Sequence, residues 1–141
     1  MKNTNITPLF NKLNLGAHEE IVVFNAPDSF EGELKQLKGV KILRDPRNPK
    51  AVKFGLAFAM TQAQLDRVSS IFAAAAEGDA VLWFAYPKGT SKRYTCEFNR
   101  DTGWNVIRGS GFDSVRAVAI DEDWSAIRFR RREYVKAGGK K

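Results

Sequence analysis

The chain has 141 residues, 43% of them hydrophobic and 28% charged, which is typical of one folded domain and excludes a disordered chain. The longest uncharged run, which begins at Phe54, is too short to cross a bilayer, since a span takes about 20 apolar residues. The start of the chain also lacks the apolar core of a signal peptide. A single cysteine excludes an internal disulfide and a cysteine-based zinc cage, and we expect a cytoplasmic location.

The net charge of +7 is concentrated in two stretches. Residues 35–53 hold seven basic side chains against one acid, and residues 125–141 hold seven against one. Such charge serves anionic partners, among them nucleic acid and nucleotides. A solvated surface with a basic tail accounts for it as well, and this second interpretation is favoured.

The first half of the chain predicts two strand-helix-strand units. A short helical turn is expected around Leu9, and the β-branched run 21–24 predicts a strand buried on both faces. A helix capped by Asp28 or Ser29 ends at Gly39, and a half-exposed strand follows at 40–43. After a proline-rich turn, 52–60 predicts a strand, and a capping box of Thr61 and Gln64 begins a helix that ends at Gly78.

The second half predicts one more buried strand, one helix and a hairpin. The strand covers 80–86, and the helix begins at Asp101 or Thr102, includes Trp104 and ends at the glycines of 109–111. Strands at 115–120 and 126–130 form an antiparallel hairpin. This order predicts a single three-layer, Rossmann-like α/β domain over residues 1–136, mainly parallel with a C-terminal antiparallel strand, and a flexible basic tail over 137–141.

Ligands bind beyond the carboxyl ends of the strands in open α/β sheets, and the loop after Tyr86 carries the richest chemistry there. Its lysines supply charge, its hydroxyls supply hydrogen bonds, and its glycine allows close approach of backbone amides. A lysine-rich surface loop is the alternative interpretation. The predicted ligand-binding residues are Lys88, Gly89, Thr90, Ser91, Lys92, Arg100 and Arg128.

No phosphate-binding glycine motif follows the first strand. The chain reads Asn25-Ala26-Pro27 where a dinucleotide or methyl-donor cofactor would need glycines, and Pro27 and Phe30 would fill that space. The sequence therefore predicts no cofactor.

The acidic run 121–123 admits a magnesium or calcium site, but adjacent residues alternate sides and no second acidic cluster completes the shell. A polar hairpin turn is favoured, and no metal is predicted. Trp124 either stacks on a ligand or closes the core with its indole N–H hydrogen-bonded, and the second is favoured. We expect three further residues to lie next to the ligand-binding residues without contacting the ligand themselves, namely Asp121, Asp123 and Trp124.

Catalytic residues are not predicted. His18 is the only histidine and lies in a polar loop, and Cys96 is expected to be a passive, partly buried thiol. In the C-terminal stretch, Arg128, Arg130 and Arg132 would share one face of a strand, either to track phosphates or to protect a sheet edge, with edge protection favoured.

Several of these segments resemble a family of small uncharacterised bacterial α/β proteins, a domain of unknown function. The resemblance rests on 82–88, Thr90-Ser91, 100–104 and 115–129, supported by 23–28. It implies a fold and no activity. The strand-helix pattern is also similar to a shrunken methyltransferase-like sheet, but Asn25-Ala26-Pro27 stands in place of the glycine loop that holds the methyl donor in such enzymes, so methyl transfer is not carried over.

These observations lead to three hypotheses about function. The first is a non-catalytic binding or adaptor module for an anionic small molecule, held by the loop 88–93. The second is a nucleic-acid-associated protein that uses the two basic stretches. The third, and least favoured, is a small enzyme acting on a phosphorylated or carboxylated metabolite with Asp121 or Asp123 as the base. No membrane partner is expected.

Overall fold

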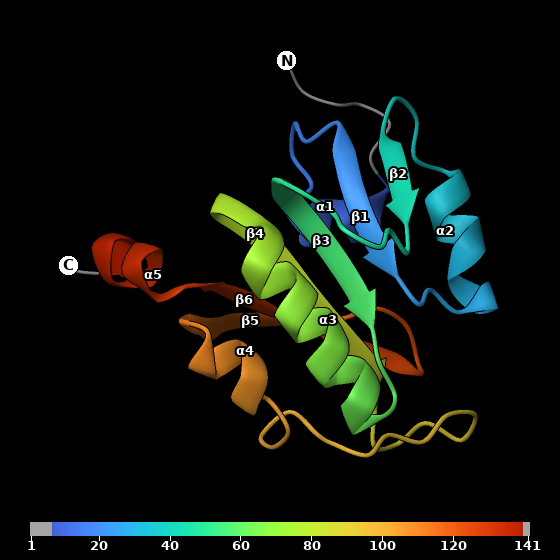
Figure 1. Cartoon of the computed structure of the whole chain (residues 1–141). Coiled ribbons are helices and arrows are strands. Elements are labelled where there is room, and N and C mark those ends of the chain that lie inside the picture. Colours follow the sequence, from blue (N-terminus) through green and yellow to red (C-terminus); the bar gives the residue numbers. More distant parts are fainter. Residues whose placement is uncertain (1–6, 140–141) are drawn as a thin grey trace.

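A computed structural model describes residues 7–139, and the strands of this part form a single sheet (Figure 1). Its elements in chain order are α1 (Pro8–Lys12), β1 (Glu20–Phe24), the 3-10 helix η1 (Asp28–Phe30), α2 (Glu31–Lys35), β2 (Lys41–Arg44), β3 (Val52–Phe58), α3 (Gln62–Ala75), β4 (Ala76–Pro87), α4 (Asn105–Gly109), β5 (Phe112–Ala119), β6 (Trp124–Arg131) and α5 (Arg132–Gly139).

Within the described residues the sheet has six strands in the order β2-β1-β3-β4-β6-β5. The first four strands run parallel to one another, and β6 is antiparallel to both of its neighbours, β4 and β5. The predicted α/β class is therefore confirmed, including the mainly parallel sheet and the C-terminal antiparallel strand. Because β1 lies between β2 and β3, the order of the strands reverses at β1.

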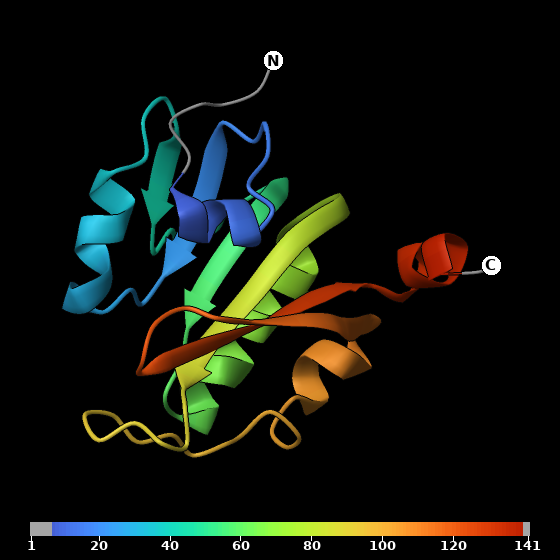
Figure 2. The ribbon, with the colours of Figure 1, turned by 180° about the vertical axis from the view of Figure 1, so that it is seen from behind.

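Helices cover both faces of the sheet and make the domain three-layered. α3 and α4 lie on the face seen in Figure 1, and α1 crosses the opposite face in Figure 2. The central strand β4 serves both hydrophobic cores, because alternate side chains of a strand point to opposite faces. Leu82 and Phe84 pack with α3 and α4, whereas Val81 and Trp83 pack with α1 and α2.

The most regular helix, α3, begins with the predicted capping box. The Thr61 hydroxyl accepts a hydrogen bond from the Gln64 amide at 3.1 Å, and the Gln64 side chain accepts one from the Thr61 amide at 3.2 Å. Leu65, Val68 and Phe72 are buried on one stripe, which places the helix against the sheet. No helix in the described part of the chain is long and apolar enough to span a membrane.

Several predicted boundaries move in the structure. α3 ends at Ala75 rather than at Gly78, because Ala76 already has extended backbone and pairs with Val52 of β3. Trp104 precedes α4 instead of lying inside a longer helix. β6 ends at Arg131, so Arg132 starts α5 and the predicted strand face of Arg128, Arg130 and Arg132 is wrong.

The predicted flexible tail, 137–141, lies partly outside the described residues. Residues 137–139 belong to α5, and 140–141 are not described. The assignment of 1–136 to one domain stays a prediction.

Candidate functional site

The carboxyl edge of the sheet holds the first candidate site, at the reversal of strand order. The chain leaves β1 on one side towards β2 and returns on the other side as β3. In open α/β sheets such a reversal leaves a crevice, and ligands bind in it. The residues that follow Phe24 and Phe58 therefore form the walls of this site.

Asn25 ties the ends of three strands together. Its backbone has a positive φ of 58°, which asparagine tolerates better than most residues, and this turns the chain sharply after β1. The Asn25 amide donates to Oδ1 of Asp45 at 2.8 Å, and its side-chain Nδ2 donates to the Phe58 carbonyl at 3.0 Å. Hydrogen bonds thus hold the ends of β1, β2 and β3 together at this edge of the sheet.

A small cavity of about 90 Å³ lies beyond the ends of β1 and β3. We call it the switch-point cavity. Phe58 narrows it, with its ring centroid 4.9 Å from that of Phe30 and 5.1 Å from that of Trp124. None of the described residues that line it is charged. Its walls are Asn25, Pro27, Phe58, Ala59, Met60, Gln64, Tyr94 and Trp124.

Trp124 closes the core, as predicted, but its indole N–H is not hydrogen-bonded. The residue is only 2% exposed, and Nε1 has no hydrogen-bond partner among residues 7–139. The other two tryptophans do have partners: Nε1 of Trp83 donates to the Leu13 carbonyl at 2.8 Å, and Nε1 of Trp104 donates to the Asn99 carbonyl at 2.8 Å. The expectation of a bonded Trp124 indole is therefore not met by any of the described residues.

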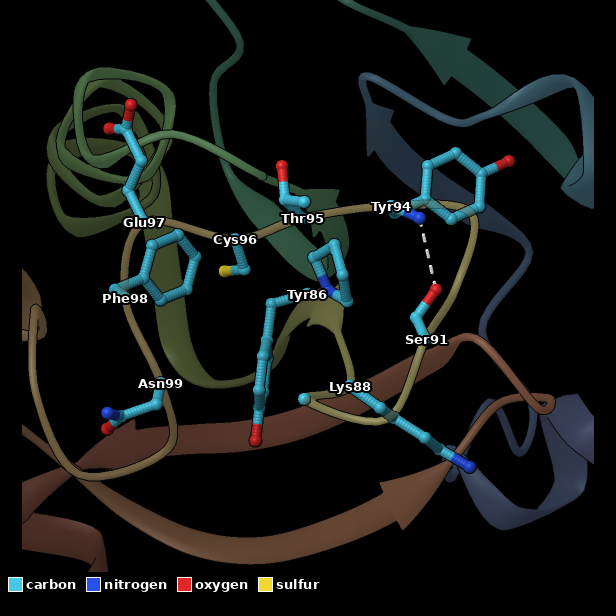
Figure 3. A pocket seen from close by; sticks show the side chains of 11 residues that line it. Tyr86, Lys88, Ser91, Tyr94, Thr95, Cys96, Glu97, Phe98 and Asn99 are labelled. Atoms are coloured by element: carbon cyan, nitrogen blue, oxygen red, sulfur yellow. Dashed lines mark hydrogen bonds between the residues drawn. The ribbon is translucent and has the colours of Figure 1, made fainter.

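A second, larger hollow of about 400 Å³ lies beyond the end of β4, and we call it the groove (Figure 3). Its walls come from Tyr86 and Pro87 at the strand end and from the irregular segment that follows. The Lys88 amide donates to the Asp123 carbonyl at 2.8 Å, and the Glu97 amide donates to the Met60 carbonyl at 2.9 Å. These bonds hold the segment across the ends of β3 and β4.

The groove wall includes a packed pair of aromatic rings and two groups that burial keeps protonated. Tyr86 and Phe98 lie with ring centroids 5.9 Å apart, and Phe98 packs on Trp104 behind it. Burial raises the pKa of the Tyr86 phenol and that of the Cys96 thiol, so both stay protonated at neutral pH. Glu97 lies on the rim, where Oε1 accepts a hydrogen bond from the Gln62 amide at 2.8 Å.

The predicted ligand-binding residues do not converge on one point. Lys88, Gly89 and Ser91 line the groove, whereas Thr90 and Lys92 are exposed outside it. In Figure 3 the Lys88 ammonium extends away from the aromatic wall of the groove. The two predicted arginines lie elsewhere. Arg100 lines a hollow of about 260 Å³ with Arg108 and Arg116, and Arg128 is paired in the sheet with Trp83 of β4.

The Ser91 hydroxyl is already hydrogen-bonded within the protein. Its hydroxyl donates to Oδ1 of Asp123 at 2.9 Å and accepts hydrogen bonds from the Arg93 and Tyr94 amides at 3.2 and 3.1 Å. Asp123 is 8% exposed, so a carboxylate lies behind the loop that was expected to cradle an anion. A buried negative charge at that position opposes an anionic ligand.

The acidic run 121–123 forms the favoured hairpin turn. Oδ1 of Asp121 accepts from the Asp123 and Trp124 amides, each at 2.8 Å, which is the bonding of an aspartate that closes its own turn. Within residues 7–139 no group of three or more histidine, cysteine or acidic side chains could hold a metal ion. His18 lies at the opposite end of β1, and burial lowers its pKa.

Sequence reasoning missed three residues at the carboxyl edge. Asn25 carried a signal, because an asparagine between a buried strand and Ala26-Pro27 is suited to a positive φ. No sequence pattern pointed to Glu97 and Phe98, since they belong to an irregular segment in which neither periodicity nor capping applies. Their positions depend on contacts with Gln62 and Trp104, which lie in other elements.

Comparison with solved structures places the fold. The mitomycin 7-O-methyltransferase MmcR aligns over 83% of this chain and 50% of its own, with 11% identity and a TM-score of 0.62. The N-methyltransferase NodS from Bradyrhizobium japonicum aligns over 87% of this chain and 92% of its own, with 13% identity and a TM-score of 0.57. A SAM-dependent methyltransferase from Aquifex aeolicus aligns over 89% of this chain and 90% of its own, with 10% identity and a TM-score of 0.56. The fold is that of Rossmann-like methyltransferases. The chain spans half the length of MmcR and most of the length of the other two.

No protein-family model matches the sequence, and no curated protein matches it either. The resemblance to a family of small bacterial proteins therefore stays a prediction.

The hypothesis of a non-catalytic module for an anionic ligand is wrong. The three solved structures named above, which share this fold, are methyltransferases, and the Ser91 hydroxyl of the expected anion cradle is bonded to Asp123. Part of the basic surface on which the nucleic-acid alternative rested is paired within the protein, and that alternative stays a prediction. Among the described residues of the two basic stretches, the ion pairs are Arg44–Glu31 at 2.8 Å, Lys53–Glu77 at 3.6 Å, Arg130–Asp79 at 2.7 Å and Arg132–Asp113 at 3.0 Å.

Proposed function

We propose that the chain is an enzyme that transfers a methyl group to a small molecule, and that the groove at the end of β4 holds the methyl donor. The observation that carries the proposal is the groove itself. At about 400 Å³ it falls in the range of sites that bind cofactor-sized molecules, and it lies beyond the carboxyl end of a central strand. The likeness of the fold to methyltransferases supports the choice of reaction. A cytoplasmic location belongs to the same proposal.

The switch-point cavity does not fit a donor the size of S-adenosylmethionine. Its 90 Å³ is well below the roughly 300 Å³ at which cofactor-sized sites begin, and Pro27 occupies the turn after β1. The groove fits better by volume and by chemistry. The rings of Tyr86 and Phe98 offer aromatic contact to a base, and the Glu97 carboxylate can accept hydrogen bonds from ribose hydroxyls.

When bound, such a donor supplies an electrophilic methyl group. The chain's own nucleophiles beside the groove are kept from competing for it, because burial holds the Cys96 thiol and the Tyr86 phenol protonated. Glu97 is held in place by its bond from the Gln62 amide, which orients the carboxylate before the donor arrives.

Calorimetric titration with S-adenosylhomocysteine, the product form of the donor, tests the proposal without knowledge of the acceptor. We expect saturable binding to the wild type and a loss of about tenfold in affinity for Glu97→Gln, since a charge-assisted hydrogen bond becomes a neutral one. Glu77→Gln is the matched control, because Glu77 lies at the other end of β4 and pairs with Lys53.

Two results would contradict the proposal. No binding to the wild type at 1 mM ligand, about the weakest affinity expected for a working site, removes the methyl-transfer function. Binding that Glu97→Gln and Glu77→Gln leave equally unchanged keeps the donor but shows that the groove does not hold its ribose.

A further inference from the structure

A further hollow, of about 330 Å³, lies between α3 and the loop that joins β2 to β3, and we call it the α3 hollow. Loop residues 47–50 form one wall, and Ser70, Ile71, Ala74 and Ala75 of α3 form the other. α3 begins at the carboxyl edge of the sheet, after β3, and ends at the amino edge, where β4 begins. The α3 hollow lies beside its last two turns and shares no residue with the groove, so a molecule bound there leaves the groove open.

We propose that the α3 hollow is the docking site of an amphipathic helix of another protein, whose apolar side chains enter the hollow and whose glutamates or aspartates face its basic wall. Such a helix would lie along the last two turns of α3. The site needs no methyl donor, so the inference goes beyond the proposed function and does not depend on it.

The short connection between β2 and β3 leaves room for a helix on this face of the sheet. Both strands pair in parallel with β1, one on each side, so the chain crosses β1 between them. A parallel crossover usually takes about a dozen residues or more and contains a helix, whereas residues 45–51 make this one alone. Because the loop lines the hollow together with α3, the crossover runs on the face that α3 covers (Figure 1). An irregular loop therefore takes the place of a crossover helix beside α3.

The outward surface of α3 next to the hollow carries no charge. Residues 68–76 include no charged side chain, although Ser70 and Ala74 are exposed and Ile71 is half-buried. A surface helix of a globular protein usually carries charged or polar residues opposite its buried stripe. Since the distance between two packed helices depends on the side chains at their contact, the short side chains of α3 allow a second helix to approach closely.

The basic wall of the hollow selects an acidic partner. Arg47 and Lys50 are both exposed, and none of the described residues that line the hollow is acidic. Neither forms an ion pair with any other residue of 7–139. A second copy of this chain is the poorer occupant, because a net charge of +7 on each copy opposes their contact. Arg47 is the better residue to test, since Lys50 also lines a hollow with three glutamates.

Nuclear magnetic resonance of methyl groups tests the proposal with a designed peptide. The probe is a peptide of about four helical turns with leucine on one face and glutamate on the others. Its matched control has lysine in place of every glutamate. We expect the glutamate peptide to shift the methyl signals of Ile71 and Ala74 with a Kd on the order of 100 µM, as suits a short segment that must order when it binds. The lysine peptide should leave both signals in place.

Two pairs of variants locate the peptide. Ala74→Glu puts a negative charge into the hollow and should weaken binding about tenfold, whereas Ala63→Glu makes the same change at an exposed position in the first turn of α3 and should not. Arg47→Gln should weaken binding about threefold, as expected for one exposed ion pair, and Arg100→Gln, which removes an exposed arginine elsewhere, should not. Should Ala74→Glu fail to fold, the arginine pair still decides.

The proposal is overturned if the glutamate peptide gives no saturable shift at Ile71 and Ala74 up to about 1 mM, or if the lysine peptide binds equally well. Equal affinities within both pairs of variants overturn it too, since the peptide would then bind elsewhere. Shifts at Ile71 and Ala74 that follow the protein concentration without peptide would make a second copy the occupant and overturn it as well. Each result is obtained without S-adenosylhomocysteine, so failure here and failure of the methyl-transfer proposal are distinguishable.

Discussion

Gly103 lies against Phe98, a residue of the groove wall, and its replacement by alanine should destabilise the protein strongly. Gly103 has a φ of +99°, a conformation that side-chain-bearing residues rarely adopt. A Cβ placed there would lie 2.6 Å from Cβ of Phe98 and 2.8 Å from Oε1 of Gln62. Neither neighbour can yield easily, because Cβ of Phe98 is attached to its own backbone and Gln62 already donates to the Gly103 carbonyl at 2.8 Å.

The expected cost combines two effects. Backbone strain at a sparsely populated φ costs about 1–3 kcal/mol, and forcing an extra methyl group into a packed site costs about 1–3 kcal/mol more. We expect Gly103→Ala to lower the free energy of unfolding by about 3 kcal/mol in total, which lies within the summed range of about 2–6 kcal/mol. For a domain of this size that is roughly 10 °C in melting temperature.

Urea unfolding followed by tryptophan fluorescence measures the effect, with Gly109→Ala as the control. Gly109 ends α4, and a Cβ added to it would have no neighbour within 4 Å, so alanine should change the stability by less than about 1 kcal/mol. If Gly103→Ala unfolds within about 0.5 kcal/mol of the wild type while Gly109→Ala behaves as expected, the reasoning about Phe98 and Gln62 is refuted.

Two further predictions concern titratable groups. The hydrogen bond from Arg130 lowers the pKa of Asp79, so its contribution to stability is complete above the ordinary aspartate pKa near 4 and is lost as the pH falls through the lower folded value. Urea unfolding at pH 7 and pH 3 should show a larger loss of stability for Asp79→Asn at pH 7 than at pH 3, and an equal deficit at both pH values would contradict this. Burial raises the pKa of Cys96. When the rate at which iodoacetamide alkylates this sole cysteine is followed against pH, its midpoint should therefore lie above the ordinary thiol pKa of about 8.5. A midpoint below that value would show that the thiol is not buried in solution.

The sequence predicted the elements well where local rules decide them. The stripe and capping box of α3 and the β-branched run of β1 depend on residues a few positions apart, so their patterns are visible in the chain. The hairpin of β5 and β6 was also predicted, because a short polar link joins two strand-like runs. The end of α3 was misplaced, since pairing of Ala76 with Val52 competes with the helix and lies outside any local window.

The candidate site was predicted less well, because its contacts join distant parts of the chain. Ser91 was expected to face a ligand, but its partner Asp123 lies 32 positions away and no local pattern reveals such a bond. Arg100 and Arg128 were grouped with the loop by charge and, for Arg100, by nearness in sequence, whereas Arg100 lines another hollow and Arg128 is paired with Trp83 of β4. The absence of glycines after β1 did carry information, because the structure shows a narrow cavity at that turn.

The pairing of β4 with β6 has a consequence for synthesis on the ribosome. The core of β4, residues 80–86, is entirely apolar, and one of its edges is covered by β3, which precedes it in the chain. The other edge stays unpaired until β6 has been synthesised, and β6 begins about 40 residues later. At ordinary rates of translation, the synthesis of these residues takes roughly 2–8 s. During this interval the nascent chain carries an open, apolar strand edge, the feature that most readily recruits another chain. Slow translation of residues 88–123 would prolong that exposure, and a chaperone that shields apolar segments would act in this window.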